Sequence, residues 1–184
     1  PVLSNVLLVV DGNTLSLTGT DLEVELVGRI ALDEACEDGE ITVPARKLMD
    51  ICKSLPDDAT LNFKVEDGKA LIKAGRSRFT LATLPANDFP NVEDGPGAMS
   101  FAVSQGKLRR LIERTSFAMA QQDVRYYLNG LLLEINQGQL RAVATDGHRM
   151  AMCTVDANID YQERYQLIVP RKGVLELARL LGEA

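Results

Sequence analysis

The sequence is short of the side chains that build catalytic and metal sites. Its 184 residues include one histidine and three cysteines, and the cysteines are widely spaced. Without a Cys-x-x-Cys pair, they argue against both a disulfide framework and a zinc site. The histidine is accompanied by no nucleophile motif, no second histidine and no glycine-rich phosphate loop. We therefore expect a protein that is not an enzyme, with no catalytic residue, no metal and no cofactor.

Long apolar runs are also missing. No stretch approaches the roughly 20 apolar residues that a membrane-spanning helix needs, so we expect no membrane partner. The composition, 46% hydrophobic and 25% charged, is sufficient for a folded core. Because free cysteines suit a reducing compartment, we expect a cytoplasmic protein. The net charge of −6 argues against a general affinity for nucleic acid.

What the sequence does have is an internal repeat of about 125 residues, the size of a whole domain. Residues 5–21 recur as 129–146, and the Thr-Val-Pro at 42–44 recurs as Ile-Val-Pro at 168–170. Only the second copy is preceded by a strand-like segment, 101–103, and a helix-like segment, 104–119. Only the first continues past its helix, from 56 to about 97. We therefore expect an internal fragment, with a first domain (1–97) lacking its opening strand and helix and a second (98–184) lacking its closing strands.

Alternating apolar stretches separated by turn dipeptides predict β-hairpins. The expected hairpins pair 7–10 with 14–18, 61–65 with 69–73, and 131–135 with 140–144. Prolines 44 and 170 and a serine at 104 mark helix starts. The expected helices cover 45–55, 105–119 and 171–182. Together these elements predict an antiparallel α+β fold with helices on one face of each sheet.

The helices are locally basic although the chain is acidic. Each expected helix carries its cations on the face opposite its apolar stripe. These cations are Arg46 and Lys53 in the first helix, Lys107, Arg110 and Arg114 in the second, and Lys172 and Arg179 in the third. If the helices face one side, they form a surface suited to a phosphate backbone. The alternative is a set of solvated helix faces with ordinary ion pairs.

The lone histidine, His148, sits in Thr-Asp-Gly-His-Arg-Met at 145–150. A hydrolase would use it with Asp146 or Asp123, but the sequence offers no nucleophile. The simpler interpretation is the end of a strand followed by an Asp-Gly turn. The paired tyrosines at 126 and 127 are likewise more typical of packing than of base stacking.

Five segments, in order along the chain, resemble the bacterial sliding clamp family, the beta subunit of DNA polymerase III. They are TVPARK (42–47), GRSRF (75–79), QDVRYYLNG (122–130), ATDGHR (144–149) and VPRKGV (169–174). The resemblance covers essentially the whole chain. It implies the DNA clamp fold, in which repeated domains of antiparallel sheet carry helices on their inner face. It also implies a homodimeric ring around duplex DNA, which acts as a processivity factor without reading base sequence. The alternative function is a DNA-binding module that forms no ring and uses the same basic helices.

The resemblance assigns roles to particular residues. The seven helix cations would line the hole, and Gln122, Tyr126 and Tyr127 would add DNA contacts near one face of the ring. A pocket for the short peptide motif of the polymerase III alpha subunit, the clamp loader and repair polymerases would include Leu128, Thr145, Gly147, His148, Arg149 and Met150. An apolar floor with polar edges suits a short extended peptide. The ring contact would use Lys69, Arg76, Arg78, Phe79 and Leu81, with Phe and Leu exposed on an edge strand that needs a partner.

Overall fold

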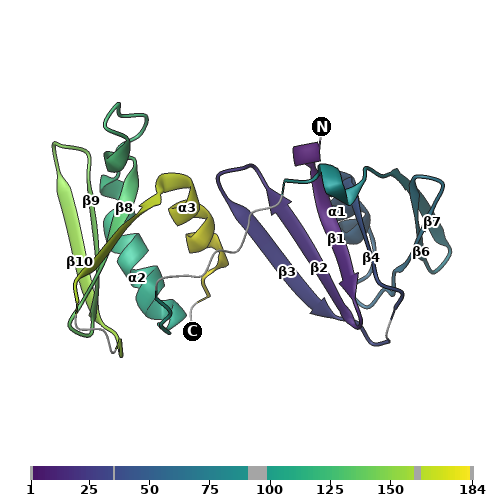
Figure 1. The fold of residues 1–184 in the computed structure, drawn as a ribbon, viewed down its shortest axis with the longest axis horizontal. Helices are drawn as coiled ribbons and strands as arrows, with labels where there is room; N and C mark the ends of the chain where they lie inside the picture. Colours follow the sequence, from purple (N-terminus) through teal and green to yellow (C-terminus); the bar gives the residue numbers. More distant parts are fainter. Residues whose placement is uncertain (1, 35, 91–98, 160–162, 183–184) are drawn as a thin grey trace. The chain divides into compact units, whose positions relative to one another are not determined.

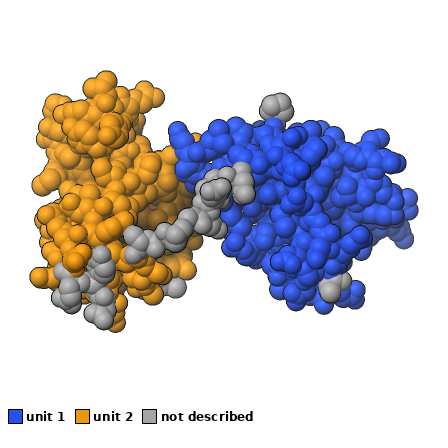
Figure 2. Space-filling model, in the orientation of Figure 1, with its two compact units in different colours: residues 1–94 blue, residues 95–184 orange. Residues whose placement is uncertain are grey.

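The computed structural model describes residues 2–34, 36–90, 99–159 and 163–182 (Figure 1). The chain divides into two compact units, residues 1–94 and residues 95–184, shown in blue and orange in Figure 2. The boundary expected at 88–97 falls mostly on residues 91–98, which lie outside the described residues. Each unit has a hydrophobic core of its own.

Unit 1 (residues 1–94) contains two antiparallel sheets, with strand orders β3-β2-β1-β4 and β5-β6-β7. Among its described residues one α-helix is present, α1 (Ala45–Ser54), which follows Pro44 directly. The core joins both sheets and α1 through Leu8, Val43, Ile51, Ile72 and Leu81. The strands are β1 (Asn5–Asp11), β2 (Thr14–Thr20), β3 (Glu25–Ala31), β4 (Gly39–Pro44), β5 (Asn62–Glu66), β6 (Lys69–Ala74) and β7 (Ser77–Ala82).

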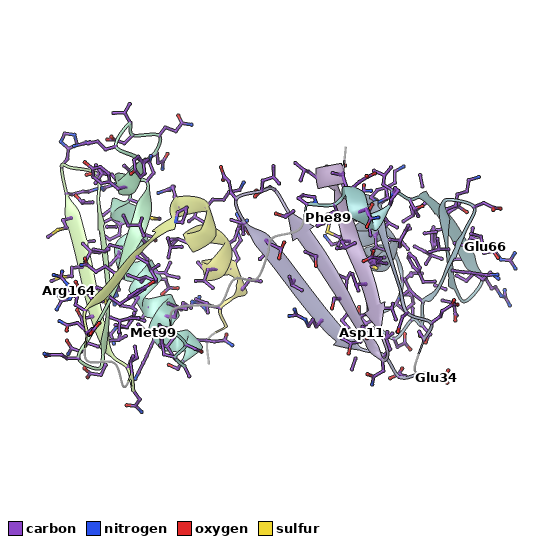
Figure 3. The ribbon with its side chains drawn as sticks, in the orientation of Figure 1. Asp11, Glu34, Glu66, Phe89, Met99 and Arg164 are labelled. Atoms are coloured by element: carbon purple, nitrogen blue, oxygen red, sulfur yellow. The ribbon has the colours of Figure 1, made fainter. Side chains whose placement is uncertain are left out.

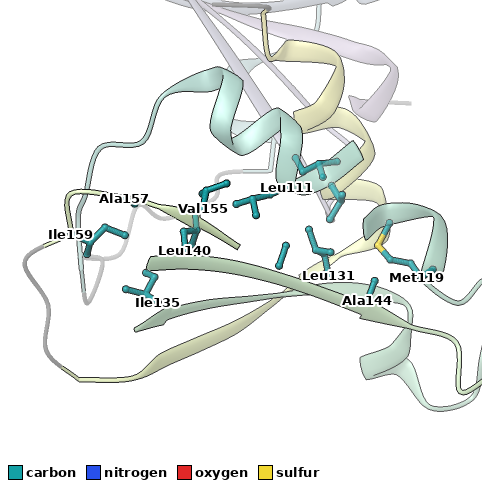
Figure 4. Close-up of a cluster of buried hydrophobic side chains, with 13 residues drawn as sticks. Leu111, Met119, Leu131, Ile135, Leu140, Ala144, Val155, Ala157 and Ile159 are labelled. Atoms are coloured by element: carbon teal, nitrogen blue, oxygen red, sulfur yellow. The ribbon is translucent and has the colours of Figure 1, made fainter. Parts of the chain in front are cut away.

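Unit 2 (residues 95–184) packs two helices against one antiparallel sheet of order β10-β9-β8-β11. Helix α2 (Gln105–Thr115) lies on β9 and β10, and α3 (Arg171–Leu180) lies on β8 and β11. Figure 4 shows the buried side chains between α2 and the sheet, with Leu111 facing Leu131, Leu140 and Val155. The strands are β8 (Gly130–Asn136), β9 (Gln139–Thr145), β10 (Met150–Asp156) and β11 (Tyr165–Pro170).

All three expected hairpins are present, and the turns of two of them explain why. Asp67 and Gly68 have φ of 49° and 69°, and Gln137 and Gly138 have φ of 47° and 77°. Two successive residues with positive φ form the type I′ turn, whose twist matches that of the flanking strands. These dipeptides therefore fix the register of β5–β6 and β8–β9 locally.

The expected helices are also present, although all three end earlier than predicted. The Ser104 hydroxyl accepts a hydrogen bond from the Lys107 backbone N–H at 3.4 Å, so Ser104 caps α2 as expected. This helix ends at Thr115 and continues as a 3-10 turn, Ser116–Ala118. The prediction of a strand at 101–103 is wrong, because the segment pairs with no strand of the described residues and stays irregular.

The two four-stranded sheets repeat each other strand for strand, with one correction to the sequence alignment. Asn5 faces Pro44 across the first sheet, and Gly130 faces Pro170 across the second. The structural counterpart of Asn5 is therefore Gly130 and not Asn129. The structural alignment of the two repeats is set by the pairing of β1 with β4 and of β8 with β11. Sequence identity between Asn5 and Asn129 does not set it.

Candidate functional site

Helix α2 presents a basic face to solvent and an apolar face to the sheet. Leu111 and Ile112 are buried, whereas Arg110 and Arg114 are exposed. The Lys107 ammonium donates to the backbone carbonyl of Asp156 at 2.7 Å, which ties the start of the helix to the end of β10. An open hollow of about 640 Å³ lies beside these cations. It is lined by Gly106, Lys107, Arg110, Gln139, Thr154, Val155 and Asp156.

The helices that follow the two prolines present matched cations. Arg46 and Lys53 are exposed on α1, and Lys172 and Arg179 are exposed on α3. Arg179 is paired with Glu176, at 2.7 Å between Nη1 and Oε1. Figure 1 shows α2 and α3 side by side within unit 2, where they are in contact. Unit 2 therefore brings the cations of two helices onto neighbouring elements, and a surface shared by both units stays a prediction.

The turn that carries Gln122 and the two tyrosines is closed by the side chain of Asn129. Asn129 accepts a hydrogen bond from the Asp123 backbone N–H at 2.9 Å and donates to the Asp123 carbonyl at 2.8 Å. Tyr126 and Tyr127 form an edge-to-face pair with centroids 5.8 Å apart, and they are 83% and 51% exposed. Their exposed rings leave both tyrosines available for a ligand, which packing residues would not be.

Asp123 is held in its charged form by a neighbouring arginine. The Arg125 guanidinium donates to both carboxylate oxygens, at 3.0 Å from Nε and 2.9 Å from Nη2, and its backbone N–H donates at 2.8 Å. Hydrogen bonds favour the ionised carboxylate, and they lower the pKa of Asp123 to about 2. This carboxylate is therefore fully ionised at neutral pH.

The turn that carries His148 is organised around Asp146. One carboxylate oxygen accepts the backbone N–H groups of Arg149 and His148, each at 3.0 Å, and these bonds lower the pKa of Asp146. The other oxygen accepts from Arg149 Nε at 3.1 Å. The two carboxylates that a hydrolase would use are thus both engaged by arginines. Within the described ranges no cluster of histidine, cysteine and carboxylate side chains could hold a metal ion.

The expected pocket residues share one end of unit 2 but differ in exposure. Leu128 and Thr145 are half-buried, Gly147 and His148 are exposed, and Met150 is 69% exposed. Sequence reasoning missed Phe117, which is 59% exposed and lies 5.6 Å from the Arg149 guanidinium. Arg149 also donates to the Phe117 backbone carbonyl at 2.9 Å. No spacing in the sequence links these two residues, which are brought together by the packing of α2 on the sheet.

The expected ring-contact residues lie on the β6–β7 hairpin, where β7 is an edge strand. Arg76 and Arg78 are exposed, and so is Lys69 on β6. The expectation that Leu81 is exposed is wrong, because it is 5% exposed and belongs to the core of unit 1. Phe79 is half-buried against the same core. Both side chains point inward because they pair across the sheet with the buried residues Ala70 and Ile72.

Comparison with known proteins agrees with this architecture. Solved structures of the DNA polymerase III beta subunit from Pseudomonas aeruginosa and of the pol III beta from Caulobacter crescentus match with TM-scores of 0.97 and 0.90, at 74% and 42% identity. They cover 100% and 98% of this chain and 50% of each of those chains. The α+β clamp fold expected from the sequence is confirmed. The molecule is a chain of the DNA clamp class.

The family assignment follows from the sequence matches. Residues 1–93 match the DNA polymerase III beta subunit N-terminal domain, and residues 102–184 match its central domain. The chain is 74% identical to the beta sliding clamp of Pseudomonas aeruginosa over 183 residues and 52% identical to that of Escherichia coli K12 over 181 residues. It therefore belongs to the DNA polymerase III beta subunit family. It spans about half the length of these curated relatives, 50% and 49%. No helix among the described residues is long and apolar enough to cross a membrane.

Proposed function

We propose that the chain forms part of a processivity factor, a sliding clamp that encircles duplex DNA and tethers a polymerase to it. The observation that carries the proposal is the set of solvent-exposed cations on each of the helices α1, α2 and α3, in a chain of this family. Lysine and arginine contacts to phosphates are independent of base sequence and are weakened by salt, which permits sliding. An acidic body with basic helices disfavours binding elsewhere on its surface.

We assign the DNA contacts to the exposed cations of the three helices and to the exposed turn before β8. The residues are Arg46, Lys53, Lys107, Arg110, Arg114, Gln122, Tyr126, Tyr127, Lys172 and Arg179. Lys107 and Arg179 are already engaged by Asp156 and Glu176. We therefore expect Arg110 and Arg114 to contribute more to phosphate binding than these two.

We assign peptide binding to the 145–150 turn and Leu128. Its partners would be the polymerase III alpha subunit, the clamp loader and repair polymerases, in the cytoplasm. Exposed Met150 and Phe117 beside the polar edge of Arg149 give the mixture that a short extended peptide requires. The beta clamp of Pseudomonas aeruginosa has been crystallised bound to griselimycin. We expect griselimycin to bind at this turn when the present chain forms part of a whole clamp.

We assign the dimer contact to the β7 edge, through Lys69, Arg76, Arg78 and Phe79. An unpaired edge strand offers its backbone groups to a partner strand. Buried Leu81 would support this edge from the core side and would not touch the partner.

The ring is tested with a chimera in which residues 1–184 replace the matching half of the Pseudomonas aeruginosa clamp. It is loaded onto nicked circular DNA by a clamp loader, and the circle is then cut once. Loss of protein on linearisation supports a ring. If the amount of protein retained on the DNA is unchanged by the cut and falls steeply with salt, the chain is a DNA-binding module that forms no ring. The proposal would then be withdrawn.

The lining is tested with Arg110→Ala in the same chimera, with Arg109→Ala as the matched control. Arg109 lies on the same helix but is paired with Glu113 at 2.8 Å. Each lost phosphate contact lowers the slope of log affinity against log salt by about 1. We expect that change for Arg110→Ala and not for Arg109→Ala. Equal slopes in the two variants would contradict the assignment of α2 to DNA.

A further inference from the structure

Two turns that carry different proposed sites lie against each other in unit 2. The first covers 121–129, with the exposed residues Gln122, Tyr126 and Tyr127, and the second covers 145–150. One contact between them is Arg125 on Gly147. A Cβ placed on Gly147 would lie 3.2 Å from Arg125 Nη2, 3.4 Å from Nη1 and 3.7 Å from Cζ. Both terminal nitrogens are nearer to this position than Cζ is, so the guanidinium presents its Nη edge to the glycine.

Arg125 is fixed from its own side. The two bonds to Asp123 hold the guanidinium as a fork, and planar fork geometry is specific to arginine. Asp123 is in turn held through its backbone by Asn129, at the entrance to β8. The low pKa of Asp123 means that the pair persists throughout the neutral range. The contact on Gly147 therefore belongs to a set of side chains anchored to the sheet.

The second turn is held by bonds within itself and by contacts from outside. Gly147 has a φ of +87°, and its N–H donates to the Thr145 hydroxyl at 3.1 Å. The bonds of Asp146 to His148 and Arg149 are internal to the turn. Contacts from outside the turn include Arg149 on the Phe117 carbonyl and Arg125 on Gly147. An added side chain at 147 would be strained by φ and would press on the guanidinium.

We propose that Arg125 is a positioning residue that locks the 145–150 turn to the 121–129 turn. The residues assigned to peptide and those assigned to DNA then form one rigid surface. The contact between Arg125 and Gly147 does not depend on what the chain binds. Its role in ligand binding rests on the proposed function.

Amide exchange measured by NMR on the 184-residue chain tests the lock. We expect Arg125→Ala to speed exchange at Gly147, His148 and Arg149 by about threefold to tenfold, because local opening is then opposed by fewer contacts. Arg125→Lys should not restore the slow exchange, since an ammonium lacks the planar fork. Arg109→Ala removes another arginine–carboxylate pair of unit 2 and should leave these amides unchanged. Unchanged exchange in Arg125→Ala, or an equal rise in Arg109→Ala, would overturn the lock.

A double-mutant cycle separates contact with Gly147 from a general loosening. Gly147→Ala should speed exchange at His148 strongly in the wild type and less in the Arg125→Ala background, where no guanidinium is displaced. Additive effects would overturn the direct contact.

Griselimycin binding to the chimera tests the use of the lock. We expect Arg125→Ala to weaken binding about threefold to tenfold and Arg109→Ala to leave it unchanged. Equal affinity of Arg125→Ala and wild type would overturn the role in binding. Failure of the wild-type chimera to bind griselimycin would instead refute the proposed pocket. The lock would then be judged by the amide-exchange data alone.

Discussion

The two four-stranded sheets share one strand order and one hairpin pattern, yet they are covered differently. In unit 2, α2 packs across β9 and β10, and α3 packs on β8 and β11. In unit 1, α1 packs on β1 and β4, in the place of α3, and the described residues contain no counterpart of α2. Figure 1 shows β2 and β3 without a helix of unit 1 across them. The comparison isolates what one helix contributes to an otherwise repeated sheet.

The difference is visible in single side chains. Ile30 pairs with Leu15 on β3–β2, as Val155 pairs with Leu140 on β10–β9. Ile30 is 54% exposed, whereas Val155 is 9% exposed. The strands supply apolar residues at the same positions in both units. Burial at these positions is therefore decided by the helix above them and not by the strand sequence.

The largest expected effect comes from shortening a buried side chain of α2. Leu111 on α2 is fully buried, and Leu111→Ala should lower the free energy of unfolding of unit 2 by about 3–5 kcal/mol. Leu17 on β2 is only half-buried, so solvent already reaches it. Leu17→Ala should therefore lower the free energy of unfolding of unit 1 by only about 1 kcal/mol. Urea unfolding gives the totals, and hydrogen exchange assigns each loss to its unit. Equal losses would mean that the β2–β3 face is covered in solution.

A second test uses the structural counterparts Gly130 and Asn5. A Cβ on Gly130 would lie 2.6 Å from the Val169 carbonyl oxygen, so Gly130→Ala must push backbone apart and should cost about 2–3 kcal/mol. Asn5 donates to the Thr42 hydroxyl at 2.9 Å, and Asn5→Ala should cost about 1 kcal/mol. Urea midpoints at constant slope measure both changes. A cost at Gly130 no larger than that at Asn5 would contradict the close approach of Gly130 to the Val169 carbonyl.

A third test concerns a buried carboxylate that the repeat does not share. Glu134 is 3% exposed on β8, and its counterpart on β1 is Val9. It accepts from Arg164, labelled in Figure 3, and from Gln166, both at 2.6 Å, and from Arg141 at 3.2 Å. Glu134→Gln should cost about 1–2 kcal/mol at neutral pH, because charge-assisted bonds are lost. Thermal unfolding at pH 7 measures this loss.

The same carboxylate predicts a pH dependence. The hydrogen bond from Arg164 and the bond from Gln166 lower the pKa of Glu134 in the folded chain. A carboxyl with a lowered folded pKa stabilises the fold above its unfolded pKa, about 4.3. That stabilisation is lost as pH falls through the folded pKa. Glu134→Val, which copies unit 1, should therefore be less sensitive to acid than the wild type. Asp123 and Asp146, whose pKa values are also lowered, contribute acid sensitivity to both chains. Identical acid-unfolding curves would refute this role of Glu134.

Much of the fold could be predicted because its determinants are local. Turn dipeptides such as Asp67-Gly68 fixed hairpins, and prolines 44 and 170 marked helix starts. The inward orientation of Leu81 was missed because an edge strand was taken to be exposed on both faces. The contact of Arg125 with Gly147 was missed for a different reason. It joins residues from two turns, and only the packed sheet brings those turns together.

The smallest effect is expected where the two sheets differ most. Ile30→Thr should change the free energy of unfolding by no more than about 0.5 kcal/mol, because its methyl groups already contact water. The matched change Val155→Thr places a hydroxyl beneath α2 and should cost about 1–2 kcal/mol. Ile30→Thr should also reduce concentration-dependent association in sedimentation, because β3 is an edge strand with exposed apolar side chains. A loss at Ile30 as large as that at Val155 would mean that the exposed face is occupied in solution. The helix would then not be what distinguishes the two sheets.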